Sequence, residues 1–240
     1  MPITVLLNNI DHKNLRVITT RGAVYGDSVM FAITFPPEFR SIQAHYPIVF
    51  RKTAEGRFEP IALFGFKERQ NLFLGPDGWD ATYLPLMVER QPFLIGIVDR
   101  PMAERELMIH VDLESPRISR TAGEALFREH GGSTEFLERM NSVLLAIHQG
   151  LESTPPFIAA LQEHKLLESF VLDVGLKDGS QNRLAGFYTI NEERLASLGG
   201  SILEVLGKSG HLQAAYMTIA SLGNFRDLIE RQNRLHAGDR

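Results

Sequence analysis

The sequence predicts an α+β protein in which a strand-rich N-terminal half precedes a helical C-terminal half that contains one β-hairpin. Short apolar and aromatic runs separated by proline and glycine fill residues 1–120. Apolar residues at helical spacing dominate residues 121–240. The change falls near residues 115–133 without a Gly/Ser linker. We therefore expect a single integrated domain over residues 1–240, strand-rich over 1–120 and helix-rich over 121–240.

The N-terminal half contains several candidate strands. The runs 48–52 and 58–63 flank a short polar segment that includes Gly56, a pattern that predicts a β-hairpin. The apolar run 29–35 is stopped by Pro36 and Pro37. Residues 71–74 lead into the turn signal Gly75-Pro76-Asp77-Gly78. Further candidate strands cover residues 93–98 and 107–111.

The C-terminal half begins with a predicted helix whose apolar residues run from Phe136 to Ile147. Thr154 followed by Pro155 predicts the start of a second helix, since proline fits the first helical turn. A β-hairpin is then expected from residues 170–174 and 184–190, with its turn near Asp178 and Gly179.

The remaining residues predict two more helices. Asn191 is a good N-cap, and Glu192 and Glu193 in the first turn favour the helix dipole. An apolar stripe continues this helix to Val205, and Gly210 marks its end. The last helix carries its apolar residues at Leu212, Ala215, Ile219, Leu222 and Leu228.

Composition and charge exclude several classes of function. A formal net charge of −4 gives no basic footprint, so we expect no nucleic-acid partner. The absence of cysteine removes disulfides, thiolate nucleophiles and cysteine-based metal sites. No basic n-region precedes the short apolar run at the N-terminus, and no apolar run reaches membrane-spanning length. We expect a soluble cytoplasmic protein without membrane insertion, or alternatively a cell-surface protein exported by a non-Sec route.

Familiar catalytic motifs are missing or out of context. Gly207-Lys208-Ser209 resembles the end of a phosphate-binding loop, but Ile202 stands where that motif needs glycine. The tripeptide also falls at a predicted helix C-terminus, where the carbonyls repel phosphate. No Gly-x-Ser-x-Gly elbow supports a hydrolase. We therefore expect no cofactor and interpret the tripeptide as a helix stop.

His110 and Asp112 are weak candidates for metal binding. Residues two apart on a strand face the same side, so both side chains could bind one iron as part of a 2-His-1-carboxylate triad. The third ligand would be a distant histidine such as His130, His148, His164 or His211. The scaffold usual for this chemistry continues with more strands, whereas this chain turns helical. A partly buried histidine near a strand end is the simpler interpretation.

An aromatic group provides the candidate ligand-binding residues. Its members are Tyr46, Phe50, Trp79, Tyr83 and Phe93, with Arg90 at the rim as a partner for a carboxylate. Core packing is the alternative, because pockets and cores use the same residue types. Trp79 is the best single candidate, since it is the only tryptophan and follows a turn that could hold it at the surface.

Several short motifs, taken together in order, resemble the bacterial SapC family. The carriers are His45-Tyr46-Pro47-Ile48-Val49-Phe50, Trp79-x-Ala81-x-Tyr83-Leu84-Pro85, Arg90-Gln91-Pro92-Phe93, Ile109-His110-Val111-Asp112, Gly123-Glu124-Ala125-Leu126-Phe127, Leu166-Leu167-Glu168, Leu184-Ala185-Gly186-Phe187-Tyr188-Thr189-Ile190-Asn191 and Ser221-Leu222-Gly223-Asn224. The resemblance implies an association with the bacterial surface layer, by the family's name, and no known catalytic residues. A transport permease of the same name crosses the membrane several times and does not fit this chain.

Three functional hypotheses follow. The first is a non-enzymatic accessory or binding protein of the SapC type that recognises a peptide or protein partner through Tyr46, Trp79, Tyr83, Arg90 and Phe93. The second is an enzyme of unrecognised type that could depend on a metal bound by His110 and Asp112. The third is a structural component related to the surface layer.

Overall fold

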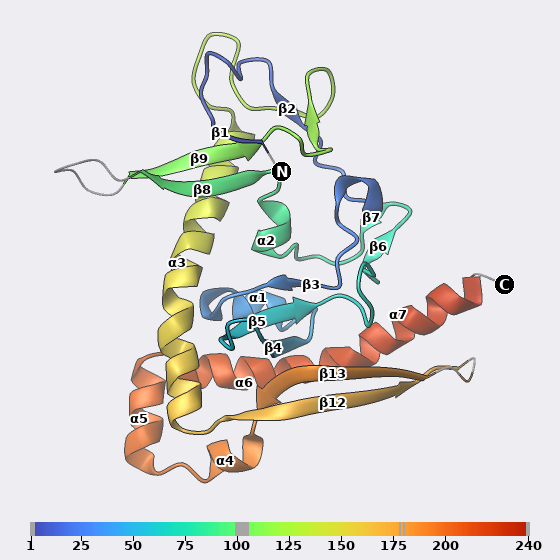
Figure 1. Ribbon diagram of the computed structural model, residues 1–240, viewed down its shortest axis with the longest axis vertical. Helices are drawn as coiled ribbons and strands as arrows, with labels where there is room; N and C mark the ends of the chain where they lie inside the picture. Colours follow the sequence, from blue (N-terminus) through green and yellow to red (C-terminus); the bar gives the residue numbers. More distant parts are fainter. Residues whose placement is uncertain (1–2, 99–105, 178, 180, 239–240) are drawn as a thin grey trace. The chain divides into compact units, whose positions relative to one another are not determined.

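The computed structural model describes residues 3–98, 106–177, 179 and 181–238 (Figure 1). Antiparallel sheets alternate with helices, and the longer helices all follow residue 134. The predicted α+β class is therefore confirmed, with strands concentrated in the N-terminal half and helices in the C-terminal half. The chain divides into two compact units. The first comprises residues 1–27 and 86–149, and the second comprises residues 28–85 and 150–240.

Two small antiparallel sheets build the first unit. The strand order is β1-β9-β8 in one sheet and β10-β2-β11 in the other. Register is set by pairs such as Phe93 with Val111, and both of these side chains are fully buried. The strands are β1 (Thr4–Leu6), β2 (Arg16–Val17), β8 (Phe93–Val98), β9 (Glu106–Asp112), β10 (Ile118–Ser119) and β11 (Glu124–Ala125). A short 3₁₀ turn, η1 (Ala23–Tyr25), and the helix α2 (Leu86–Glu89) complete the unit together with the first part of the helix α3 (Glu135–Glu163).

An ion pair occupies the interior of the first unit. Arg117 and Asp27 have no exposed side-chain surface, and Arg117 Nη2 lies 2.5 Å from Asp27 Oδ2. Arg117 Nη1 donates to the carbonyls of Ile18 and Thr20, each at 3.0 Å. Asp27 also accepts from the Gly22 amide. These bonds fix the segment between β2 and η1. They also pair the two buried charges, and a buried charge is tolerated only when it is paired.

A five-stranded antiparallel sheet forms the second unit's framework, with strand order β12-β13-β4-β5-β3. The predicted hairpin of residues 48–63 is confirmed, since Val49 pairs with Ile61 and the chain turns at Thr53–Gly56. The expected strand at 71–74 is reduced to a two-residue ladder, β6 (Leu74–Gly75) with β7 (Gly78–Trp79). The sheet's strands are β3 (Phe31–Ile33), β4 (Ile48–Lys52), β5 (Phe58–Leu63), β12 (Leu167–Gly175) and β13 (Gln181–Ile190). Asp178, part of the predicted turn, lies outside the described residues.

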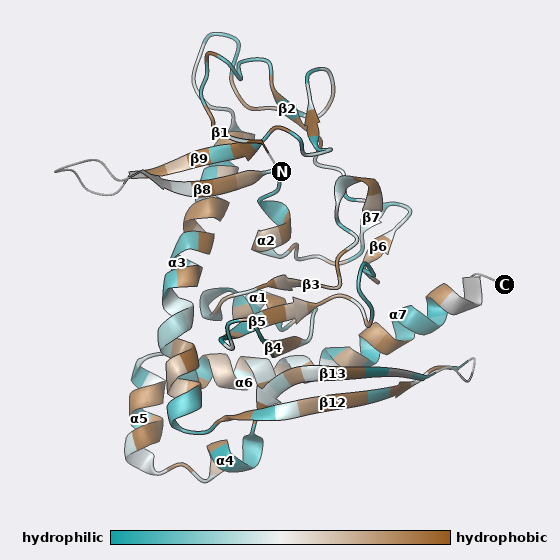
Figure 2. Ribbon diagram, viewed as in Figure 1, coloured by the Kyte–Doolittle hydropathy of each residue, from teal (hydrophilic) through white to brown (hydrophobic). Residues whose placement is uncertain are grey.

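Helix α6 packs against this sheet through small residues. It contacts β4, β13 and the helix α1, and Ala214 and Ala215 are buried along it. Hydrophobic and hydrophilic bands alternate along α3 and α7 in Figure 2, as expected for helices with one buried face. The unit's helical elements are η2 (Pro36–Glu38), α1 (Phe39–Ile42), α4 (Glu192–Ala196), α5 (Gly200–Lys208), α6 (His211–Ser221), η3 (Leu222–Asn224) and α7 (Phe225–Gly238).

The prediction that a new helix begins at Thr154 is wrong, because Thr154 lies inside helix α3. The helix continues without a break from Glu135 to Glu163 and contains both Pro155 and Pro156. Proline has no amide hydrogen to donate to the carbonyl of the residue four positions earlier, so each proline costs the helix one hydrogen bond. Burial of Phe157, Ile158 and Leu161 on the same helix offsets that loss.

The Asn191 cap is confirmed, but the helix it begins is shorter than expected. The Asn191 side chain accepts the Arg194 amide at 2.7 Å. The predicted continuous stripe to Val205 is wrong, because the chain breaks after Ala196 and α5 starts at Gly200. Helix α5 ends at Lys208, so the helix stop expected at Gly207-Lys208-Ser209 is confirmed.

Candidate functional site

Tyr46 and Trp79 lie in one aromatic cluster of the second unit. Tyr46 has no exposed surface and contacts the rings of Phe64, Phe73 and Trp79 at centroid distances of 5.2, 4.7 and 6.4 Å. Trp79 is half-buried and stacks on Phe73 at an interplanar angle of 14°. The sequence signal that suggested a pocket therefore coincides with a packed core.

A chain of hydrogen bonds joins the polar groups of this cluster. Trp79 Nε1 donates to the Tyr46 hydroxyl at 2.8 Å, and that hydroxyl donates to the Tyr83 carbonyl at 2.5 Å. The Tyr83 hydroxyl donates in turn to Glu38 at 3.0 Å, which also accepts from Thr34. Burial raises the pKa of Tyr46 well above its usual value, so its hydroxyl stays protonated at neutral pH. Both the Trp79 indole and the Tyr46 hydroxyl are engaged inside the protein.

Arg90 and Phe93 lie in the first unit, at the turn that connects α2 to β8. Phe93 has no exposed surface. Arg90 Nη1 donates to the Phe93 carbonyl at 2.7 Å. Burial lowers the pKa of Arg90. Of the five residues predicted from the sequence, three share the second unit and two the first, and their contact with a ligand stays a prediction.

His110 and Asp112 share β9, but each has a local partner. The His110 ring covers Gly96, where an added Cβ would lie 2.3 Å from Cε1. Asp112 Oδ1 accepts the Glu114 amide at 3.0 Å, which fixes the turn after β9. Among the described residues, no three His, Asp or Glu side chains are grouped so that they could hold a metal ion. The iron hypothesis thus gains no third ligand from this part of the chain.

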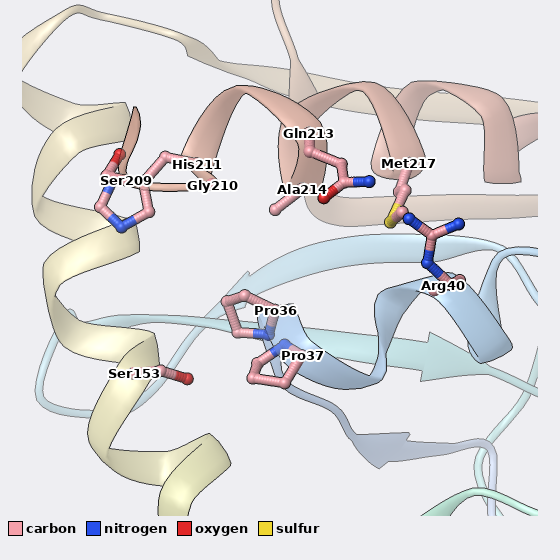
Figure 3. Close-up of a pocket in the computed structure, with 10 residues that line it drawn as sticks. All are labelled: Pro36, Pro37, Arg40, Ser153, Ser209, Gly210, His211, Gln213, Ala214 and Met217. Carbon is pink, nitrogen blue, oxygen red and sulfur yellow. The ribbon is translucent and has the colours of Figure 1, made fainter. Parts of the chain in front are cut away.

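A small pocket of about 270 Å³ opens at the start of α6 (Figure 3). His211, the first residue of α6, has its ring 5.6 Å from that of Phe157, and burial lowers its pKa. Figure 3 shows Arg40 beside Met217, at the opposite end of the pocket from His211. The pocket's polar groups do not converge on one position. Sequence reasoning considered His211 only as a distant metal ligand.

A larger and more apolar groove of about 490 Å³ lies between the β4–β5 hairpin and the C-terminal half of α3. Ile158 is 7% exposed at its floor, whereas Leu151 keeps 47% of its surface exposed. The groove lay outside the sequence predictions, because β5 and α3 are about a hundred residues apart. Its lining residues are Ile33, Thr53, Gly56, Arg57, Phe58, Glu59, Pro60, Leu151, Thr154, Pro155, Ile158, Ala159 and Gln162.

The rim of this groove carries charge of both signs. Glu59 is paired with Arg51, whose guanidinium also lies over the Phe31 ring at 4.4 Å. Among the described residues, the Arg57 side chain is ion-paired only with the exposed Glu55, at 3.9 Å, and that side chain is 80% exposed. An exposed ion pair of this kind contributes little to stability. Arg57 is therefore the rim cation that is readily available to an acidic group.

Comparison with known proteins identifies the family. The SapC family model matches residues 7–228 of the 240-residue chain. No curated protein and no solved structure matches. Within the described residues, no helix combines the length and apolar character needed to cross a membrane. Because the match covers both compact units almost completely, the chain belongs to the SapC family.

Proposed function

We propose that this SapC-family protein is a binding protein that recognises a peptide or protein partner through the apolar groove between the β4–β5 hairpin and α3. The observation that carries the proposal is the half-exposed Leu151 beside the almost buried Ile158 in a groove of about 490 Å³. Sites for small ligands and peptide side chains have this size and this mixture of apolar lining with few polar groups.

The lining of the groove indicates the chemistry of the partner that it would bind. Apolar side chains entering it would leave water and cover Leu151, which favours binding by about 25 cal/mol for each Å² of apolar surface buried. The available cation on the rim, Arg57, favours an acidic residue next to the apolar ones. We therefore expect an apolar peptide segment flanked by an acidic side chain.

The five residues proposed from the sequence have different parts in this function. Tyr46 and Phe93 have no exposed surface, so they support their units from inside. Trp79 and Tyr83 are half-buried and belong to the same unit as the groove, so they can contact the same partner. Arg90 is half-buried in the first unit. Substituting Trp79 or Tyr83 tests their contribution separately from the groove.

A random peptide library displayed on phage, selected against the full chain, tests the groove. We expect selected peptides to be rich in apolar residues with an acidic neighbour. Ala159→Glu places a carboxylate on the lining and should weaken their binding by at least about tenfold, a loss of about 1.4 kcal/mol. Arg57→Gln should weaken only the peptides that carry the acidic residue.

The matched control is Ala220→Glu, which adds the same charge to an exposed alanine of α6 that lines none of the described pockets. Calorimetry with a synthesised peptide should give the same affinity for this variant as for the unchanged chain. Peptides that bind Ala159→Glu as tightly as the unchanged chain, or a selection that yields no binding peptide, would contradict the proposal.

A further inference from the structure

Another pocket, lined by residues of the first unit, differs in chemical character from the groove. Its volume is about 350 Å³, and the residues that matter for its chemistry are Tyr25, Arg90, Leu94, Asp112 and Glu114. The turn after α2 supplies Arg90, β8 supplies Leu94, the end of β9 supplies Asp112, and the turn after β9 supplies Glu114. All of these segments belong to the first unit.

Arg90 is a shielded cation that has no counter-ion among the described residues. The one hydrogen bond from its side chain to a described residue is the donation from Nη1 to the Phe93 carbonyl at 2.7 Å. No described carboxylate lies within salt-bridge distance of the Arg90 guanidinium, and burial lowers the pKa of Arg90. A guanidinium taken out of water without a pair is costly. The remaining donors of Arg90 would be satisfied by a planar anion such as a carboxylate.

Asp112 and Glu114 place negative charge in the same pocket. Asp112 Oδ1 accepts the Glu114 amide at 3.0 Å, and neither acid forms an ion pair with a described residue. A purely anionic ligand would meet these two acids, and a purely cationic ligand would meet Arg90. A ligand with one charge of each sign avoids both repulsions.

We propose that this pocket binds a small zwitterion, an amino acid or a short peptide whose carboxylate meets Arg90 and whose ammonium group meets Asp112 and Glu114. Leu94 and the Tyr25 ring provide apolar surface for the ligand's side chain. The available volume suits a ligand of this size. This site does not rest on the proposed function, because the groove that carries that function lies in the second unit.

The test compares zwitterions with singly charged analogues on the full chain. The probes are L-leucine and the dipeptide Leu-Leu, against leucinamide, which lacks the carboxylate, and N-acetyl-leucine, which lacks the ammonium group. We expect at least one zwitterion to bind in calorimetry and both analogues to bind at least about tenfold more weakly. The preferred zwitterion distinguishes a free amino acid from a peptide.

Variants then assign the two charges. Arg90→Gln should weaken binding of the zwitterion about tenfold or more, and Glu114→Gln should weaken it by a smaller factor because Asp112 remains. Arg120→Gln removes an exposed arginine that does not line the pocket and should leave the affinity unchanged. Because Arg90 also contacts Phe93, Arg90→Lys serves as a second variant that keeps the charge and should bind at an intermediate affinity.

Two outcomes would overturn the proposal. One is the absence of binding by either zwitterion at about 1 mM, a concentration that detects even weak small-molecule binding. The other is equal binding of the zwitterions and their singly charged analogues, which needs no variant to interpret. Either result leaves the groove untouched, since Ala159→Glu reports on that site alone.

Discussion

Arg117 and Asp27 form a fully buried ion pair across 90 residues of sequence, with Nη2 and Oδ2 2.5 Å apart. Arg117 also has its guanidinium carbon 5.4 Å from the centre of the Tyr25 ring. Arg21 approaches the other oxygen of Asp27 at 3.5 Å. One carboxylate thus joins two arginines that come from different segments of the first unit.

Removing one partner of this pair should strongly destabilise the protein. Arg117→Met leaves Asp27 buried without its closest counter-charge, and we expect a loss of about 3–5 kcal/mol in the free energy of unfolding. The double variant Asp27→Asn with Arg117→Met should lose less than the sum of the single losses. Denaturation in urea measures all three variants. A loss no larger than that of the exposed Arg120→Gln would contradict the prediction.

Gly150 and Gly207 should respond in opposite directions to alanine. Both are helical, but a Cβ at Gly150 would lie 2.5 Å from Cγ of Phe35, whereas one at Gly207 meets nothing within 4 Å. Overpacking at Gly150→Ala should cost about 1–3 kcal/mol. Gly207→Ala should gain up to about 1 kcal/mol from helix propensity. Thermal unfolding compares the two, and a stabilised Gly150→Ala variant would show that the Phe35 ring yields without cost.

His211 should make stability depend on pH on the acid side. Burial lowers its folded pKa below the ordinary value of 6.5, so the unfolded chain binds more protons as the pH falls below that value. Stability should therefore decline between pH 6.5 and the lowered folded pKa. His211→Gln should remove this part of the decline, as measured by urea midpoints over the pH range. The exposed His130→Gln should retain it.

The expectation of a single domain can be tested with the only tryptophan, Trp79, which reports on the second unit. If the chain unfolds cooperatively, Arg117→Met in the first unit should lower the urea midpoint recorded by Trp79 fluorescence. That midpoint should coincide with the one from circular dichroism. An unchanged fluorescence midpoint in Arg117→Met would mean that the units unfold independently.

Local patterns in the sequence predicted the parts of the fold that local interactions determine. The hairpin around Gly56 and the cap at Asn191 formed as expected, because turn geometry and capping depend on a few neighbouring residues. The prediction of a helix start at Thr154 failed. Burial of Phe157 and its neighbours carried α3 through Pro155, and that burial depends on contacts far along the chain.

The candidate sites likewise depend partly on residue type, which the sequence shows, and partly on contacts between segments remote in sequence. The sequence identified Arg90 as a partner for a carboxylate, and the tertiary structure shows that it lines the same pocket as Asp112 and Glu114. The groove between β5 and α3 had no sequence signal, since its residues are ordinary core and rim types.

The sequence by itself determined the α+β class, the main hairpins, the helix ends at Asn191 and Lys208 and the resemblance to the SapC family. Only the tertiary structure decided which charged residues are paired, such as Arg117 with Asp27, and that Arg90 is shielded with no counter-ion in the described part of the chain. The reason is physical: pairing and desolvation depend on distances between segments remote in sequence, whereas turns, caps and periodicity depend on neighbours.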